Sequence, residues 1–402
     1  MTRFYSLDEL TLLHAKDLAQ RADVKQPNGA EDTVCTVFAA SPESIVPPNV
    51  IYHGSHNLQP TVPNLLLDSN PGLLFPRVTP GHDIAVARLL DAMCIDGGII
   101  IDRSSRLYSE SFRQIARARH RVGLDAVTEE RFRLTTVPRK FRYVSGRCIF
   151  LDGEHFAAYG HFLGEIITRL WVRAFVDLTT FTIVCGKVAT PHLLPLLEPF
   201  GIRRSQVVLN DGAVICEELW VPSQSFLVRQ STTLAARSTW KVIADHYDQH
   251  HGPQRVYISR SGTGSRPLLN EAQVEQLFQS HGFQVVRPET LPVGSQVNQF
   301  RNAKWLAGCS GSNMFNCAFS GPEQRKFLLT SRNYILHTDV LLNAGAQYPL
   351  TYFIGEPERE VHVHAAWKVD LVSLETAVND WLDQTALPHF GACETFLGRG
   401  CC

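Results

Sequence analysis

The feature that most constrains the fold is a regular alternation of short apolar runs and helical segments from residue 143 onward. Strand-like runs fall at residues 146–153, 181–186, 205–210, 218–223, 255–260, 283–288, 304–309 and 325–330. Helix-like segments fall at residues 161–175, 191–201, 232–250, 270–282, 294–303 and 311–319. Strands that alternate with helices in units of about 30 residues favour parallel sheets with crossover helices. The sequence therefore predicts an α/β fold.

The alternation occurs in two series, which the long helical segment 232–250 separates. A chain of 402 residues is also longer than one average domain. We therefore expect two Rossmann-like units, an N-terminal one at 81–235 and a C-terminal one at 236–372. Residues 1–80 are rich in Pro, Asn and Ser and are expected to be an irregular lead-in that belongs to the first domain. Residues 373–402 are expected to form a C-terminal helix and a tail.

The first part of the chain has a less regular pattern. The spacing of Leu7, Leu10 and Leu13 predicts a short amphipathic helix. Residues 83–93 read as a helix and 97–102 as a buried strand. Residues 110–123 read as a helix with a basic, solvated face that ends near Gly123.

Composition excludes several classes of partner. The formal net charge is -1, so no global field favours nucleic acid or an anionic membrane, and any anion site has to be local. No stretch reaches the ~18 uncharged apolar residues that a membrane span needs. The ten cysteines show no CxxC or metal-ligand spacing, which favours reduced, buried thiols over a disulfide framework.

A basic, glycine-containing loop follows the predicted strand at 255–260. It reads SGTGSRPLL from Ser261 and carries Arg260 and Arg266. In parallel α/β sheets ligands bind beyond the carboxyl ends of the strands, so this position suits an anion. The loop lacks the GK[ST] of a P-loop, and an arginine-containing βα turn without a ligand is the alternative.

The helix after this loop is locally well determined. Asn270 is a good N-cap, and Gln273 is placed to complete a capping box. Glu271 lies in the first turn, where the helix dipole favours a negative side chain. Gly282 supplies a left-handed C-terminal stop. We interpret this helix as the element that fixes the position of the arginine loop.

A second loop, AGCSGSNMFNCAF at 307–319, also follows a strand and opens a helix. Its small residues allow close approach of the backbone to a ligand, and free N–H groups at a helix start suit a phosphate. Together with the two arginines, it predicts a diphosphate site. The predicted binding residues are Arg260, Arg266, Asn270, Glu271, Gly308, Ser310, Gly311, Ser312, Asn313 and Asn316.

Taken in order, these motifs resemble the core of glycosyltransferase family 61. The pattern is a YISR strand, a second Arg, NE opening a helix, GF and a strand, a helix with Gln, Phe and Ala, and a small-residue loop before N-x-x-F. It falls on Tyr257–Arg260, Arg266, Asn270–Glu271, Gly282–Phe283, Gln296, Phe300, Ala303, Gly308, Gly311, Asn316 and Phe319. An upstream family motif, His-x-x-x-Asp/Glu at a helix start, resembles His161 and Glu165. The resemblance covers about residues 145–330. Two departures are Ser310, where the family has His, and Ser312, where it has Ala.

The resemblance implies a GT-B architecture, with two Rossmann-like domains across a cleft, and inverting transfer of a hexosyl, pentosyl or N-acetylhexosaminyl group. The donor-binding domain would be 236–372 and the acceptor-side domain 81–235. The sequence contains no Asp-x-Asp motif of the kind used by metal-dependent glycosyltransferases, so no metal or other cofactor is expected. Side-chain cations would then stabilise the leaving diphosphate. Inversion needs one general base, and either Glu165, which the sequence slightly favours, or His161 could supply it.

The expected partners are a nucleotide-sugar donor and a glycan or polysaccharide acceptor, free or lipid-linked, with no nucleic acid and no transmembrane segment. The expected setting is bacterial capsular-polysaccharide synthesis in the cytoplasm, with peripheral attachment to the inner membrane as one arrangement. The alternative is a non-catalytic nucleotide- or glycan-binding relative that keeps the fold, which the two serine departures leave open. A serine hydrolase is disfavoured because residues 308–312 do not form GxSxG.

Overall fold

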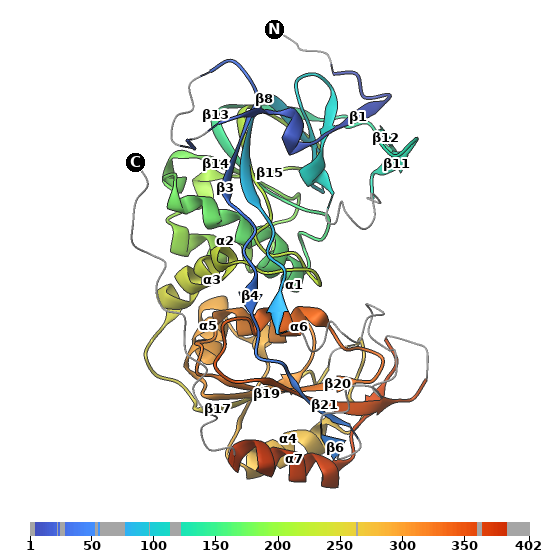
Figure 1. Ribbon diagram of the computed structural model, residues 1–402, viewed down its shortest axis with the longest axis vertical. Helices are drawn as coiled ribbons and strands as arrows, with labels where there is room; N and C mark the ends of the chain where they lie inside the picture. Colours follow the sequence, from blue (N-terminus) through green and yellow to red (C-terminus); the bar gives the residue numbers. More distant parts are fainter. Residues whose placement is uncertain are drawn as a thin grey trace.

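The computed structural model describes residues 5–21, 23–24, 29–52, 55–56, 77–95, 97–112, 122–262, 264–359 and 364–383. They form a mixed α/β fold with two large sheets, one above the other in Figure 1, and helices between them. The helix predicted at 110–123 falls largely outside the described residues. No helix in the described ranges is both long and apolar enough to cross a bilayer.

The first sheet has 12 strands in the order β11-β12-β1-β10-β9-β8-β16-β13-β14-β15, and β3 and β2 branch from β8. Four adjacent strands of this sheet run parallel to one another: β16, β13, β14 and β15. β16 runs antiparallel to its other neighbour, β8. The strands are β1 (Leu10–Leu13), β2 (Ala19–Gln20), β3 (Thr33–Phe38), β8 (Ile84–Ile95), β9 (Ile99–Ile101), β10 (Arg106–Tyr108), β11 (Leu124–Ala126), β12 (Arg131–Leu134), β13 (Phe141–Leu151), β14 (Thr182–Cys185), β15 (Val207–Leu209) and β16 (Ala213–Pro222). The parallel group is the part that the alternation predicted.

The helix predicted at 83–93 is wrong, because these residues form β8 in the middle of the sheet. Its Ala, Leu and Met content suits a helix, but pairing with both β16 and β3 overrides that weak preference. Asp91 has a left-handed backbone (φ 46°). The pairing of β8 with β16 includes Leu90 and Ala92 but not Asp91. The pairing with β16 nevertheless keeps one register on both sides of Asp91.

The helix predicted from Leu7, Leu10 and Leu13 is also wrong. The segment forms β1, which pairs with β10 and β12, and only residues 15–17 turn helically, as η1 (Ala15–Asp17). Three leucines spaced by three gave a false helical period, and Leu10 and Leu13 are instead buried in the apolar clusters of the first sheet.

The second sheet has eight strands in the order β18-β17-β19-β20-β21-β5-β6, with β22 attached to β21. From β18 to β5 every pair is parallel, as the second series of alternating elements predicted. The strands are β5 (Asn49–Tyr52), β6 (Ser55–His56), β17 (Arg255–Ile258), β18 (Gln284–Val286), β19 (Trp305–Cys309), β20 (Arg325–Ser331), β21 (Leu350–Pro357) and β22 (Trp367–Lys368). A separate pair joins β4 (Glu43–Ser44) and β7 (Val78–Thr79).

One strand of the N-terminal lead-in does not stay with the first sheet. β5 pairs in parallel with β21 through four residues of each strand, from Asn49 opposite Thr351 to Tyr52 opposite Ile354. The lead-in was expected to belong to the first domain, and this part of it extends the second sheet instead. Val50 and Ile51 are buried, so burial of a short apolar run explains its position.

Helices cover both faces of the second sheet (Figure 1). α4 (Glu271–Ser280) and α7 (Leu371–Asp383) pack on one face, in a cluster that includes Phe278 and Trp381. α5 (Val293–Asn302) and α6 (His337–Leu342) cover the face that points toward the first sheet. The helix predicted near the C-terminus is thus confirmed as α7.

A helical layer lies between the two sheets and joins their cores. Its connector, α3 (Leu234–Tyr247), matches the predicted helical segment, and its Trp240 donates Nε1–H to the Leu163 carbonyl at 2.9 Å. α2 (Leu193–Leu197) continues into η7 (Glu198–Phe200), which ends at the left-handed Gly201. One buried apolar cluster includes residues from both sheets, such as Ile149 and Ile258.

The helix predicted at 161–175 is helical but irregular. It consists of α1 (Tyr159–His161), the π-helical η4 (Phe162–Ile166) and the 3₁₀-helical η5 (Ile167–Ala174). Thr168 donates its hydroxyl to the Gly164 carbonyl at 2.6 Å, and such back-bonding competes with the regular ladder. Single π turns are frequent at functional sites.

The other short 3₁₀ elements lie in connections between strands and helices. They are η3 (Ser109–Ser111), η6 (Leu178–Thr180), η8 (Arg204–Gln206), η9 (Pro288–Thr290) and η10 (Met314–Phe319). The seven cysteines of the described residues are free and buried, as expected for reduced thiols.

Candidate active site

The arginine loop begins where β17 ends, and α4 holds it there. Glu271, in the first turn of α4, accepts a hydrogen bond from the Arg260 backbone N–H at 2.5 Å. Glu275, one turn further on, accepts from the Ser259 hydroxyl at 2.5 Å. Burial raises the pKa of Glu271, and the bond from Arg260 opposes that shift. Glu271 therefore positions the loop backbone.

Asn270 does not cap α4 through its side chain, which corrects the predicted capping box. Its Nδ2 donates to the Val369 carbonyl at 2.9 Å, and its Oδ1 accepts from the Val369 N–H at 3.3 Å. These bonds tie the start of α4 to the segment between β22 and α7. Gly282 does have the predicted left-handed backbone (φ 79°).

Arg260 and Arg266 both converge on Gly311. A Cβ placed on Gly311 would overlap Nη1 of Arg260 and would lie 3.3 Å from Nη2 of Arg266. Arg260 donates to the Ser265 carbonyl at 3.0 Å and to Asn313 Oδ1 at 3.4 Å. The sequence thus correctly grouped the two arginines with the second loop.

Arg266 is held in an unusual conformation. Its backbone is left-handed (φ 54°), and Trp367 donates Nε1–H to its carbonyl at 3.0 Å. Its guanidinium lies 3.6 Å from the centroid of the Tyr334 ring, a cation–π contact. Burial lowers the pKa of Arg266, and the neighbouring Arg260 charge acts in the same direction. Two guanidinium groups so close together favour an anion between them.

The small-residue loop is only partly available to a ligand. Gly308 is packed, because a Cβ there would come within 2.8 Å of Ile258 and Met314. The Ser310 hydroxyl donates to the buried Asp339 carboxylate at 2.6 Å. Ser312 is exposed and Gly311 lies against the arginines.

The helix after this loop is shorter than predicted. It is the six-residue 3₁₀ element η10, and the Asn313 side chain already accepts from the Met314 N–H at 3.2 Å. A short, capped 3₁₀ turn offers less to a phosphate than the N-terminus of a regular helix. The arginines are therefore the stronger feature for anion binding.

Burial of Asp339 dominates the electrostatics beneath the loop. It raises the pKa of this carboxyl to about 7, whereas the bonds from Ser310 and Tyr352 and the Arg266 charge lower it. Burial also raises the pKa of Tyr334. Asp339 lies in the first turn of α6, so this helix fixes the position of the carboxylate that Ser310 contacts.

His161 and Glu165 lie on one face of the irregular helix, as their spacing predicted. His161 Nδ1 is 3.2 Å from Glu165 Oε2. The His161 side chain is 31% exposed and that of Glu165 is 7% exposed, so the ring lies between the carboxylate and solvent. The exposed His155 ring lies beside that of His161, with centroids 4.7 Å apart and the planes tilted by 36°. An imidazole backed by a buried carboxylate is a typical general-base arrangement.

The two predicted motif regions meet at Gly160. A Cβ on Gly160 would lie 3.0 Å from the Ser312 hydroxyl and 2.9 Å from the Phe315 ring. Next to it, Tyr159 donates its hydroxyl to the Asn316 side chain. Asn316 is fully buried and also donates to Gln296 at 3.3 Å. Asn316 thus joins the two parts of the site.

Several residues of the site were not found from the sequence. Tyr334 and Asp339 lie more than 60 positions after Arg266, beyond any recognisable motif, and only the fold brings them under the loop. His155, Tyr159 and Gly160 lie beside His161 in the chain, and the run HFAAYGH was the signal that could have included them. In the described part of the chain, no group of three or more His, Cys, Asp or Glu residues is suited to hold a metal ion.

The small-residue loop, on which the two arginines converge, and the helix with the His–carboxylate pair therefore meet at Gly160. Residues 159–327 match the family model described as Glycosyltransferase 61. The match begins at α1 and ends in β20, so it includes His161, Glu165 and both arginines. Residues 159–327 are thus a glycosyltransferase family 61 region, which supports glycosyltransferase as the activity class. No curated protein matches the chain.

Proposed function

We propose that the protein is an inverting, metal-independent glycosyltransferase, which moves a sugar from a nucleotide-sugar donor to a hydroxyl of a glycan. The observation that carries this proposal is the contact at Gly160. It brings a His–carboxylate pair next to a loop with two converging guanidinium groups. Inverting transfer needs one general base and a stabilised leaving group, and these two features can supply them.

On the donor side, Arg260 and Arg266 bind the diphosphate. Guanidinium groups pair with phosphate oxygens through charge-assisted, often bidentate hydrogen bonds. As the bond from the anomeric carbon to the diphosphate breaks, negative charge grows on the leaving oxygen. The fixed Arg266, held by Trp367 and Tyr334, meets that charge without reorganisation. No metal ion is required for this step.

On the acceptor side, His161 removes the proton from the attacking hydroxyl and Glu165 orients the ring. With Nδ1 protonated toward Glu165 Oε2, the second ring nitrogen is the basic atom. The sequence slightly favoured Glu165 as the base, but its burial behind the ring favours the opposite assignment. The acceptor oxygen then attacks the anomeric carbon from the face opposite the diphosphate, which inverts the configuration.

The GT-B arrangement belongs to the same proposal. The two sheets and the connector α3 support units at 81–235 and 236–372, with the donor held by the second unit. The strand β5 adds part of the lead-in to that unit. Cytoplasmic synthesis of a bacterial surface polysaccharide is the setting that we propose for the reaction.

A non-catalytic binding protein is the second candidate, and one observation favours it. Ser310 replaces the family's usual His, and its hydroxyl is bonded to Asp339, so no imidazole is available at this position. A protein of this kind would keep the arginine site and lose turnover.

A screen of nucleotide sugars separates the two candidates. The thermal midpoint of the wild-type chain is measured with UDP-, GDP-, CMP- and dTDP-linked sugars, because a ligand that binds only the folded state stabilises it by mass action. We expect one donor to raise the midpoint and to be hydrolysed slowly or transferred to added glycan. Stabilisation with no turnover would support the binding protein, and no stabilisation by any donor would contradict both.

A further inference from the structure

A cavity of about 240 Å³ lies beside η10. It is enclosed by α3, the end of α5, the end of η10 and the residues that follow α6. Its walls include the buried Trp240 and Phe319, and four cationic side chains line it: Arg237, Lys241, Arg301 and Lys326. None of the predicted donor-binding or catalytic residues is among its lining residues.

Lys326 is the unusual member of this group. It lies on β20, is 4% exposed, and donates from Nζ to Asn343 Oδ1 at 2.9 Å. Within the described ranges no carboxylate pairs with it, and Asn343 is neutral. Burial accordingly lowers the pKa of its ammonium. An ammonium has three donors, so most of its hydrogen-bonding capacity is left for a group in the cavity.

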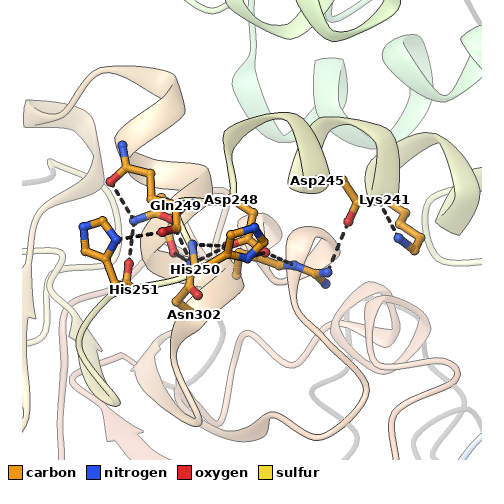
Figure 2. Close-up of polar contacts among 9 residues, drawn as sticks. Lys241, Asp245, Asp248, Gln249, His250, His251 and Asn302 are labelled. Carbon is orange, nitrogen blue, oxygen red and sulfur yellow. Dashed lines mark hydrogen bonds and ion pairs between the residues drawn. The ribbon is translucent and has the colours of Figure 1, made fainter.

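The other three cations already have acidic partners. Arg237 pairs with Glu43, and Lys241 pairs with Asp245 on the same helix. Arg301 reaches Asp245 at 3.1 Å and Asp248 at 3.4 Å. Figure 2 shows Asp245 and Asp248 at the C-terminal end of α3. Asn302 donates a hydrogen bond to Asp248.

These pairs fix the rim cations Arg237, Lys241 and Arg301. Among the described residues that line the cavity, Lys326 is the cation without a carboxylate partner. Arg237 lies against Gly345, 2.9 Å from the position of a Cβ there, and Arg301 lies 3.9 Å from that position on Gly321. The rim therefore holds its shape without a ligand. A buried charge that has no counter-ion and lines a cavity is costly unless the cavity receives an anion.

We propose that this cavity binds a small organic anion through a phosphate or carboxylate group placed on Lys326. Its volume is below the ~300 Å³ of pockets for drug-sized ligands, which suits a body of about one sugar ring. The apolar wall, with Trp240 and Phe319, takes the rest of the ligand. The site is independent of the proposed transfer reaction.

The test uses the full-length protein and four probes at constant ionic strength: inorganic phosphate, glucose 6-phosphate, glucuronate and neutral glucose. Binding is measured by calorimetry and thermal midpoint. We expect at least one anion to bind saturably and glucose not to bind. The phosphate-containing probes and glucuronate distinguish a phosphate from a carboxylate ligand. No binding by any of the three anions, or equal binding of glucose, would overturn the proposal.

Variants connect the binding to Lys326. Lys326→Met should weaken the anion about tenfold to a hundredfold, because a charge-assisted hydrogen bond is lost. The free variant should unfold at the wild-type temperature or above it, since an uncompensated buried charge is removed; a purely structural lysine would give a lower midpoint. Lys304→Met, at an exposed position, is the matched control and should bind normally.

A second variant covers the case in which Lys326→Met fails to fold. Ala318 is partly exposed and lines the cavity, so Ala318→Leu narrows it without altering Lys326. This variant should no longer bind the anion, although Lys326 and the other charged side chains of the cavity are unchanged. Unchanged affinity in either folded variant would show that the anion binds elsewhere and would overturn the proposal.

Discussion

The two parts of the candidate site arrange their charges alike but present different groups to a ligand. On the donor side, the guanidinium groups of Arg260 and Arg266 face a loop at the end of regular parallel strands, and the negative group, Asp339, lies beneath that loop. On the acceptor side, the negative group, Glu165, lies behind a half-exposed imidazole on an irregular helix. Each side therefore buries a carboxylate behind a nitrogen-containing group. That group is a pair of guanidinium cations on the donor side and an imidazole on the acceptor side. The difference predicts that one side binds and the other side reacts.

Replacing His161 should give the largest effect. His161→Ala removes the proposed base, so transfer should fall by about 10²–10⁴-fold, the usual contribution of general base catalysis. Affinity for the nucleoside diphosphate should not change, because the ring is not part of the arginine loop. Turnover with saturating donor and acceptor checks this. His155→Ala, which removes the neighbouring ring, is the control and should retain most activity.

Replacing Glu165 should give a smaller loss and so separate the two roles. Glu165→Gln removes a charge-assisted hydrogen bond to His161, worth about 1.5–3 kcal/mol, or roughly tenfold to a hundredfold in rate. The ratio of kcat between this variant and His161→Ala is the informative quantity. A larger loss in Glu165→Gln than in His161→Ala would make Glu165 the base.

Adding one methyl group at Gly160 tests whether the two parts depend on close contact. Gly160→Ala should destabilise the protein by about 1–3 kcal/mol and weaken donor binding, because the new Cβ meets Ser312 and Phe315. Chemical unfolding measures the change in stability, and a donor titration measures the change in affinity. Gly153→Ala, whose Cβ would meet Ile166 at an ordinary 3.4 Å, is the matched control. Equal effects of the two substitutions would argue against a special contact.

Asp339 should give a pH dependence of stability. Burial raises the pKa of Asp339 to about 7, above that of the unfolded chain. The folded state then keeps this proton where the unfolded state has lost it, so the stabilisation is complete at low pH and is lost as the pH rises through 7. The slope is at most about 1.4 kcal/mol per pH unit.

The matched variant for this prediction is Asp339→Asn, which cannot titrate. Unfolding free energies measured from pH 5 to pH 8 should decline for the wild type relative to the variant. Parallel curves for the two proteins would show that Asp339 does not carry the raised pKa.

The regular part of the molecule could be predicted from the sequence, and the reasons are local. Strands β17 and β19 and helix α4 have clear periods, and Gly282 marks a helix end, so the order of elements around Arg260 followed directly. The grouping of both arginines with Gly311 followed from the shared edge of a parallel sheet.

The remainder depended on contacts between distant segments. β8 and β1 have helix-like sequences, and only their neighbours in the sheet make them strands. β5 joins the second sheet across 300 residues of chain, which no local pattern shows. The π turn at Glu165 and the Asn270 side chain bonded to Val369 likewise depend on partners that no spacing rule identifies.

The most direct test of the account is a calorimetric titration of the nucleoside diphosphate of the cognate donor. Arg260→Ala and Arg266→Ala should each weaken binding by about 1.5–3 kcal/mol, while His161→Ala binds like the wild type. Arg287→Ala is the control, because Arg287 pairs with Glu275 outside the loop, and it should also bind normally. Unchanged affinity in both loop variants, or an equal loss in His161→Ala, would contradict the division into a binding side and a reacting side.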